Sequence, residues 1–552
     1  MISFASIALG LFSAIILQLV VTRYTSDGAA KRGQTGTPTL LPHWIPYFGH
    51  LPRLLFQSDG FLGRRRKAAE GGAFALTAMG RQYNIISSPG SIAAALENAE
   101  SALDYHEPAI NVLKAAFSFP KADETTLKAI LTSNEERCIL PQSVTEHLTT
   151  TALKTIQSTI PDLLSFMSNL IDQFPWERYT IISLPEADST STTSDIAIVD
   201  LHLLLRNYIT HHLTRILLPH SLLESHTHAQ SFVQDLWTMN AALFQLTLGL
   251  PRWLPIPRLT SAHIARRNLL WSLGGLFYAL DRVKRGEEPS GEWRDLDDEF
   301  AELSPFVRHV QDVYGDLKPE ARASMALVGL LGLSVRLMRL VLWTVVHIAQ
   351  SKSLVARVRE ETKENVRATQ PPLVFGVAEP VHLEIDGEVL AREGSCPVLE
   401  SCYTESVRLY DRSLGLASVI QTCELHAGGE GNSDGKKDTL VLEEDTMLAT
   451  VPYLHNLSEA VFDDPLQWNP DRQLKDTLLP DGLDLLAGGG AQFVKTLSVA
   501  LIAGVLAVWD VEIPHKIPKA GRSITVAGPK GIVKARLKRR ELRESAQGAL
   551  GH

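Results

Sequence analysis

Two charged residues in the segment CYTESVRLY carry the first chemical signal. Glu405 and Arg408 are three positions apart, so a helix would place both side chains on one face. A buried carboxylate and a buried guanidinium need partners, because desolvation of a lone ion is very costly. Further along, VFDDPLQWNPDRQL supplies Arg472, which could complete a Glu–Arg–Arg triad. Alone, the ExxR spacing is a weak signal, because it often occurs by chance.

Two arginines, Arg336 and Arg339, lie near the middle of an apolar helical pattern at 319–361. One interpretation is that nearby carboxylates or helix carbonyls satisfy them, or that they face outward. The other is an anion clamp that holds a carboxylate or phosphate of a ligand, a task that suits the planar fork of arginine. They are therefore the two weak candidates for a catalytic role.

A glycine cluster, Gly488, Gly489 and Gly490, leads into the apolar segment AQFVKTLSVALIAGVLAV. The cluster lacks the GxxxxGK[ST] pattern and follows no clear strand, so a phosphate-binding loop is disfavoured. The four cysteines form no CxxC pair, which argues against a zinc site and against a disulfide framework. No metal site is expected.

The elements around these residues are mostly helices. Apolar residues recur at three- and four-residue spacing, and strand-like pieces are short. The expected helices are 145–173, 199–218, 226–248 and 319–361, and the expected strands are 418–424 and 440–451. Two central arginines would cost about 5–7 kcal/mol in a membrane, so 319–361 is predicted to be a buried helix. The fold class is mainly α with small β-sheets.

The first residues predict a membrane anchor. Ile2–Val21 contains no charge and, as a helix, would span roughly 30 Å, one bilayer core. No basic residue precedes this run, as it would in a signal peptide, whereas Arg23 follows it. The positive-inside rule then places the body in the cytosol. The predicted organisation is 1–22 anchor, 23–48 linker and proline-rich hinge, 49–535 one domain, and 536–552 basic, polar tail.

The composition excludes other classes. The chain has 552 residues, of which 45% are hydrophobic, and its formal net charge is 53 − 62 = −9. A large core is therefore available and global disorder is excluded. No overall basic field exists to attract nucleic acid, so nucleic acid is not an expected partner.

In order and spacing, these pieces resemble cytochrome P450. The anchor and LLPHWIPYFGH resemble the start of a microsomal P450, and 319–361 resembles the long central helix over the haem. SCPVLESCYTESVRLY resembles the helix with the ExxR motif, and VPYLHNLSEAVFDDPLQWNPDR resembles the segment that follows it. The nearest likeness is to the branch of sterol 7- and 12-hydroxylases and related fungal enzymes. The resemblance implies a P450-like fold in which Glu405, Arg408 and Arg472 are structural.

The haem motif of this family, FGGGxxxCxGR, is degenerate here. Alignment on Gly488–Gly490 puts Val494 at the position of the cysteine that binds iron, and Thr496 and Leu497 at the following glycine and arginine. A valine side chain has no lone pair and cannot coordinate iron. The family also carries an acid or amide beside a threonine in the central helix. Here these positions hold Arg336 and Leu337, neither of which can deliver a proton near neutral pH. No cofactor is therefore expected.

Three functions remain open. The first is a non-redox enzyme on a P450-like scaffold, which carries out a cyclisation, isomerisation or dehydration in the biosynthesis of a lipophilic secondary metabolite. The second is a non-catalytic scaffold or partner of other pathway enzymes at the same membrane. The third is a haem-dependent monooxygenase, as the family name implies. The missing thiolate argues against the third, because its electron push drives O–O cleavage.

Overall fold

The computed structural model describes most of the chain. The described residues are 16–27, 36–54, 61–64, 73–97, 102–133, 139–164, 174–177, 179–183, 196–223, 226–288, 293, 303–370, 380–427, 438–472, 490–514, 516–521 and 523–542. The chain divides into two compact units. Unit 1 lies within 1–109, 412–466 and 476–484, and unit 2 lies within 110–411, 467–475 and 485–552.

Unit 1 is built on a six-stranded sheet with the order β1-β2-β3-β12-β9-β4. Its strands are β1 (Thr39–Leu40), β2 (Phe74–Ala78), β3 (Arg81–Ile86), β4 (Leu103–Asp104), β9 (Gly415–Val419) and β12 (Met447–Thr450). A separate hairpin pairs β10 (Cys423–Ala427) with β11 (Asp438–Leu442). The short helices α3 (Pro89–Glu97) and α17 (Pro452–Asn456) also belong to this unit.

The sheet of unit 1 joins distant parts of the sequence. β12 pairs in parallel with β3, with Leu448 opposite Asn84, and antiparallel with β9. All four residues of β12 are buried, as expected for a central strand covered on both faces. The expectation of one domain over 49–535 stays a prediction. Local periodicity carries no sign of the division, because unit 1 forms only when 412–466 returns to the early strands.

Unit 2 holds most of the helices. They are α4 (His106–Phe117), α5 (Glu124–Ser133), α6 (Gln142–Thr159), α7 (Leu201–Leu217), α8 (His226–Asn240), α9 (Leu243–Thr247), α10 (Leu259–Lys284), α12 (Pro305–Val313), α13 (Pro319–Ala349), α14 (Lys352–Thr362), α15 (Gly387–Leu390), α16 (Pro397–Tyr410) and α18 (Gly490–Val508). Three short 3₁₀ helices add Lys121–Asp123, Ile160–Asp162 and His220–Leu223. The unit is mainly helical, as the sequence predicts.

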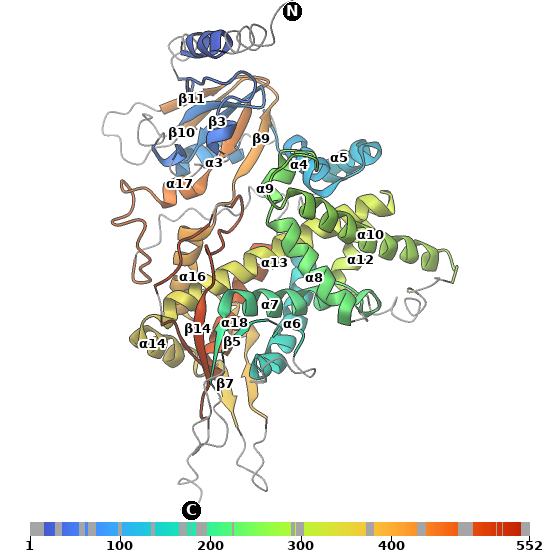
Figure 1. Ribbon diagram of the computed structural model, residues 1–552, viewed down its shortest axis with the longest axis vertical. Coiled ribbons are helices and arrows are strands. Elements are labelled where there is room, and N and C mark those ends of the chain that lie inside the picture. Colours follow the sequence, from blue (N-terminus) through green and yellow to red (C-terminus); the bar gives the residue numbers. More distant parts are fainter. Residues whose placement is uncertain are drawn as a thin grey trace, which may run out of the picture. The chain divides into compact units, whose positions relative to one another are not determined.

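Helix α13 is the centre of unit 2. It packs against α10, α18, α7 and α16, and Figure 1 shows it running among these helices. In the described part of the chain, α13 and α18 are the two helices long and apolar enough to cross a bilayer. However, 83% and 78% of their most apolar windows are buried inside the protein. A helix that is apolar all round and covered by other helices is a core helix.

The long helical pattern at 319–361 is two helices in the structure. α13 ends at Ala349 and α14 begins at Lys352. The Ser351 hydroxyl accepts a hydrogen bond from the Leu354 amide at 3.3 Å, which makes Ser351 the N-cap of α14. The helix predicted for 145–173 is also shorter, since α6 ends at Thr159, a 3₁₀ turn follows, and 165–173 lies outside the described residues.

Unit 2 contains two small sheets. One has the order β13-β14-β6-β5, with β5 (Ile181–Ser183), β6 (Ile196–Asp200), β13 (Trp509–Glu512) and β14 (Lys534–Arg539), and the other pairs β7 (Val366–Thr369) with β8 (His382–Ile385). The predicted basic, polar tail over 536–552 overlaps the first of these sheets. Residues 536–539 belong to β14, in which Ala535 and Leu537 are fully buried while the basic residues alternate outward.

The N-terminal prediction falls largely outside the described residues, which begin at residue 16. Residues 16–27 form a helix with exposed apolar side chains. The hinge after it lies along β2, because β1 pairs in parallel with β2 and the His50 amide donates to the Thr77 carbonyl at 2.7 Å. The anchor itself stays a prediction.

Candidate functional site

The predicted charged triad assembles at the C-terminal half of α16. Arg408 donates from Nε to Glu405 Oε2 at 2.7 Å and from Nη2 to Glu405 Oε1 at 2.8 Å, and neither side chain is exposed. Arg472 approaches the same carboxylate, with its Nε 3.5 Å from Glu405 Oε1. The backbone N–H of Asn469 also donates to Glu405 Oε1 at 3.0 Å. Arg408 thus binds both carboxylate oxygens, and the contacts from Asn469 and Arg472 tie α16 to the segment 467–472.

The start of α16 explains why the helix forms where it does. Pro397 takes the first helical position, where its missing N–H costs nothing. The Glu361 carboxylate of α14 accepts hydrogen bonds from the Val398 and Leu399 amides at 2.8 and 3.0 Å. An acidic side chain from a neighbouring helix thus replaces a local cap and complements the positive end of the helix dipole.

Beside the triad, α13 and α16 are joined by a stack of aromatic rings. Trp343 and Tyr410 stack with centroids 4.0 Å apart, and His347 stacks on Trp468 at 4.7 Å. The His347 Nε2 and Tyr410 hydroxyl lie 2.7 Å apart. Burial lowers the pKa of His347 to about 4, so its imidazole is neutral at physiological pH.

The two central arginines of α13 both have partners. Arg336 Nη2 lies 3.4 Å from Asp411 Oδ2, and these side chains are 12% and 2% exposed. Arg339 Nη1 donates to the Ser523 hydroxyl at 3.2 Å and to the Val526 carbonyl, and its guanidinium lies 5.9 Å from the Trp237 ring centroid. Burial lowers the pKa of Arg339 to about 10, which still leaves it charged. Both arginines therefore have partners inside the protein, and their role as an anion clamp stays a prediction.

Sequence reasoning missed Asp411. It directly follows α16 and pairs across the fold with α13, so no local spacing marks it. The available signal in the sequence is that Asp411 directly follows RLY, the last three residues of the ExxR helix.

The degenerate glycine motif lies at the start of α18. Gly488 and Gly489 lie outside the described residues, and Gly490 is the first residue of the helix. An added Cβ on Gly490 would lie 3.0 Å from Leu333 Cδ2 of α13, so the two helices approach closely here. Val494 is 1% exposed. Lys495 Nζ lies 2.9 Å from Glu400 Oε2 and thereby connects α18 with α16.

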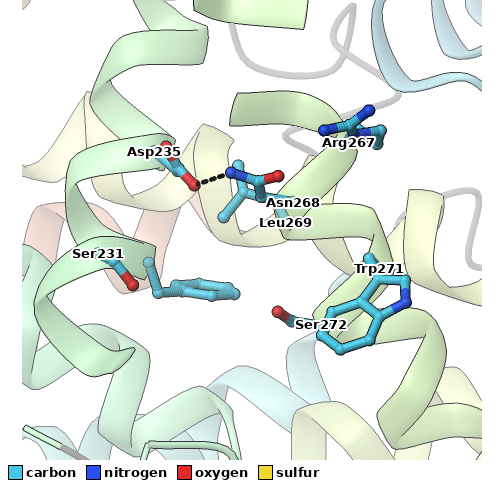
Figure 2. A pocket seen from close by; sticks show the side chains of 8 residues that line it. Ser231, Asp235, Arg267, Asn268, Leu269, Trp271 and Ser272 are labelled. Carbon is cyan, nitrogen blue, oxygen red and sulfur yellow. Dashed lines mark hydrogen bonds between the residues drawn. The ribbon is translucent and has the colours of Figure 1, made fainter. Parts of the chain in front are cut away.

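A separate pocket of about 460 Å³ lies between α8 and α10. Figure 2 shows Asp235 and Asn268 at its edge, where the Asn268 amide donates to Asp235 Oδ2 at 3.0 Å. Burial raises the pKa of Asp235. Trp271, on the same pocket, is 71% exposed, so the pocket is a surface feature. None of the residues singled out by sequence lines it.

Comparison with solved structures identifies the architecture. The chain matches the retinoic acid-bound cyanobacterial CYP120A1 with a TM-score of 0.59 and 15% identity, over 92% of this chain and 100% of that one. It has a cytochrome P450 fold. A segment of 238 residues is also 24% identical to cytochrome P450 7A1 of Oryctolagus cuniculus. This segment covers 42% of either protein, so the match spans about two-fifths of that relative. No protein-family model matches the chain.

In a P450 fold, a cysteine thiolate binds the haem iron. Among the described residues, the one that aligns with this cysteine does not fit that group. Val494 offers no donor atom, and Leu333 packs against Gly490 at the start of α18. Burial raises the pKa of the Cys402 thiol to about 12 and also raises that of Cys396 and Cys423, so these described thiols stay protonated. Cys138 lies outside the described residues.

Proposed function

We propose that the protein is a membrane-anchored P450-fold enzyme that carries out a non-redox step in the biosynthesis of a lipophilic metabolite without haem. The observation that carries the proposal is the buried valine at the ligand position, Val494, together with the contact between Leu333 and Gly490. A P450 fold with no thiolate donor loses the group that activates oxygen, but it keeps the scaffold. A fold hosts different chemistries according to its site residues.

Two observations support a lipophilic substrate. The solved structure with the same fold holds retinoic acid, an apolar carboxylic acid. The uncharged run Ile2–Val21 would keep the protein at a bilayer, where apolar intermediates accumulate. On this proposal, the body faces the cytosol at the endoplasmic reticulum, beside other enzymes of a secondary-metabolite pathway.

The buried pair Arg336 and Asp411 is the polar element proposed for catalysis. Arg336 cannot act as an acid near neutral pH, but its fixed positive charge can stabilise negative charge that develops on an oxygen of the substrate. Asp411 can take a proton from one carbon of the substrate and return it to another. Such an isomerisation balances without a metal, an oxidant or a second substrate.

The first experiment is the absorption spectrum of the purified, detergent-solubilised chain, reduced and exposed to carbon monoxide, with its iron counted. The expected result is a folded protein with no Soret band and no stoichiometric iron. A Soret band at the P450 position, with about one iron per chain, would overturn the haem-free proposal and restore the monooxygenase.

The catalytic role is tested in an extract that contains the accumulated precursor of a knockout strain. The purified chain should convert this precursor, and Asp411→Asn should lower kcat by at least about 100-fold, the lower range for loss of an acid–base group. Lys495→Gln is the matched control, because it also breaks a cross-helix ion pair but lies on α18. Equal activity of all three proteins would refute the role of Asp411.

A non-catalytic partner is the second candidate. Arg336 and Arg339 both bind groups of unit 2. This favours the alternative, because neither arginine is then available to bind an anionic group of a ligand. On this alternative, the knockout still accumulates a precursor, but the purified chain does not convert it. Co-purification of a pathway enzyme with the full chain would then identify the partner.

A further inference from the structure

The pocket between α8 and α10 plays no part in the reaction proposed above. It has a volume of about 460 Å³ and lies within unit 2. That volume falls in the usual range for small-molecule sites, roughly 300–1,000 Å³. Ser231 and Asp235 are four positions apart on α8, so they lie on one face of this helix. Asn268 and Ser272 have the same spacing on α10, and the walls of the pocket are therefore the facing sides of two packed helices.

The pocket contains the hydroxyl group of a buried serine. Ser272 is only 8% exposed, and in the described part of the chain its hydroxyl has no hydrogen-bond partner. Figure 2 shows this hydroxyl directed from α10 toward α8. A hydroxyl can donate one hydrogen bond and accept two, and a buried one that stays unpaired costs free energy. The hydroxyl of Ser272 is therefore available to a bound molecule that offers it a polar partner.

Two further polar side chains meet at the edge of the pocket. The side-chain amide of Asn268 donates to Asp235 Oδ2 at 3.0 Å, as the dashed line in Figure 2 shows. This bond uses one of the two carboxylate oxygens and one of the two amide N–H groups, so acceptors and a donor remain for a ligand. Burial raises the pKa of Asp235, which means that the carboxylate is partly shielded from water. Hydrogen bonds in such surroundings are stronger than in bulk water.

An exposed indole ring lies beside these polar groups. Trp271 lines the same pocket and is 71% exposed. The face of an indole ring carries a negative electrostatic potential, which attracts the slightly positive C–H bonds of a ligand. Arg267 also lines the pocket, and no carboxylate in the described part of the chain lies within ion-pair distance of its guanidinium. The pocket thus offers one aromatic face together with both donors and acceptors of hydrogen bonds.

The charges of the pocket favour a neutral ligand. Arg267 opposes a cation and Asp235 opposes an anion, because like charges repel. A wholly apolar molecule would cover the polar groups of Asp235, Asn268 and Ser272 without pairing them, which costs free energy. The remaining class is a neutral molecule that has several hydroxyl groups and an apolar face. A pyranose sugar has both, since hydroxyl groups surround its ring and C–H bonds cover one face of it.

We propose that the pocket between α8 and α10 binds a sugar, with one face of the ring on Trp271 and its hydroxyl groups bonded to Asp235, Asn268 and Ser272. Because Trp271 is exposed, the rest of a glycoside or glycan can extend from the pocket into solvent. No residue proposed for catalysis lines the pocket, so this binding does not depend on the proposed reaction.

The test uses the full chain in a detergent without a sugar headgroup, titrated with the methyl glycosides of glucose, galactose, mannose and N-acetylglucosamine. Saturation-transfer NMR reports which ligand protons contact the protein, and the titration gives Kd. Trp271→Ala and Asp235→Asn change the pocket. Trp253→Ala is the matched control, because Trp253 is 76% exposed but does not line the pocket. Unfolding in urea checks that each variant is folded.

The expected result is that at least one glycoside binds, with the strongest saturation at its ring C–H protons. Trp271→Ala and Asp235→Asn should each weaken this binding by at least about 10-fold, while Trp253→Ala leaves it unchanged. If no glycoside binds, or if either pocket variant binds as well as the unchanged chain, the proposal is wrong. Acetate, tetramethylammonium and glycine betaine are the charged probes. Tighter binding of any of them than of every glycoside, with dependence on Asp235 or Trp271, would assign the pocket to a charged ligand and overturn the sugar.

Discussion

The Glu405–Arg408 pair makes the sharpest prediction for a single residue. Both side chains are fully buried, and Asn469 and Arg472 add to the same carboxylate. Glu405→Gln removes the charge but keeps the shape, so Arg408 stays buried without its counter-ion. Breaking one side of a buried ion pair typically costs about 3–5 kcal/mol. The free energy of unfolding, measured with urea and tryptophan fluorescence, should fall by this amount.

The control for this change is Asp471→Asn. Arg357 and Asp471 also form an arginine–carboxylate pair, at 3.0 Å, but their side chains are 50% and 65% exposed. Water and salt screen such a pair, and its loss should leave the urea midpoint unchanged. Similar effects for both variants would show that burial does not decide the strength of these pairs.

The buried imidazole of His347 predicts a pH dependence of stability. Burial lowers the pKa of His347 in the folded protein to about 4, below its ordinary value of 6.5. The unfolded chain therefore binds this proton first, and stability is full above pH 6.5 and is lost as the pH falls toward 4. At pH 4.5 the share of His347 in this loss is about 2–3 kcal/mol, since one pKa unit corresponds to about 1.4 kcal/mol.

The measurement is the free energy of unfolding at pH 7 and pH 4.5 for the unchanged chain and for His347→Gln. Glutamine can still form a hydrogen bond with Tyr410 but does not titrate, so this variant should lose less stability on acidification. His382→Gln is the control, because His382 is exposed on β8. If His347→Gln loses as much stability between pH 7 and pH 4.5 as the unchanged chain, His347 is not the group that causes this loss.

At the same scale, the sequence predicted contacts within short segments better than contacts between distant ones. Glu405 and Arg408 share a helix face, and their pairing follows from a spacing of three. Asp411 is the partner of Arg336, and only the packing of α13 against the end of α16 brings these two residues together. No pattern along the chain contains that information.

At the scale of elements, Gly49 controls how the hinge joins the sheet of unit 1. Its φ is +53°, and an added Cβ would lie 2.1 Å from the Thr77 carbonyl oxygen. Gly49→Ala must therefore distort either the hinge or β2, and it should destabilise unit 1 by about 1–3 kcal/mol, the range for such strained backbone. Amide hydrogen exchange of β2 and β3 measures the effect.

Gly63→Ala is the matched control for the hinge. A Cβ on Gly63 would meet nothing within 4 Å, so this change should leave exchange in β2 and β3 as it is. If Gly49→Ala also left this exchange unchanged, the close approach of the hinge to β2 would be wrong.

The elements themselves show where sequence periodicity is sufficient. Apolar spacing predicted the long central helix, because its burial on all sides leaves a continuous apolar pattern. It did not predict the break after Ala349, where a single capping serine starts a new helix. It also missed β14, whose alternation of basic and apolar residues resembles a solvated tail until β6 and β13 are known to flank it.

At the scale of the whole molecule, two units are assembled from interleaved segments of one chain. Unit 1 needs strands from the first hundred residues and from 412–466, and unit 2 needs α13 and α18 from opposite sides of that insertion. Propensity and periodicity describe each segment alone. The likeness to a P450 was recognisable because several motifs occur in the family order, and order along the chain is information that a sequence retains.

The burial of α13 leads to a prediction about membrane topology. The window of α13 is apolar enough to cross a bilayer, but other helices bury 83% of it, so the ends of α13 should lie on the same side of the membrane. Lys318 precedes α13, Lys352 follows it, and both are exposed. In sealed vesicles with the cytosolic face outward, Lys318→Cys and Lys352→Cys should both react with an impermeant maleimide without detergent. The unchanged chain gives the background from its own four cysteines. Labelling of one position only after detergent would mean that α13 crosses the membrane, and the packing of α13 against α10, α16 and α18 would then be wrong.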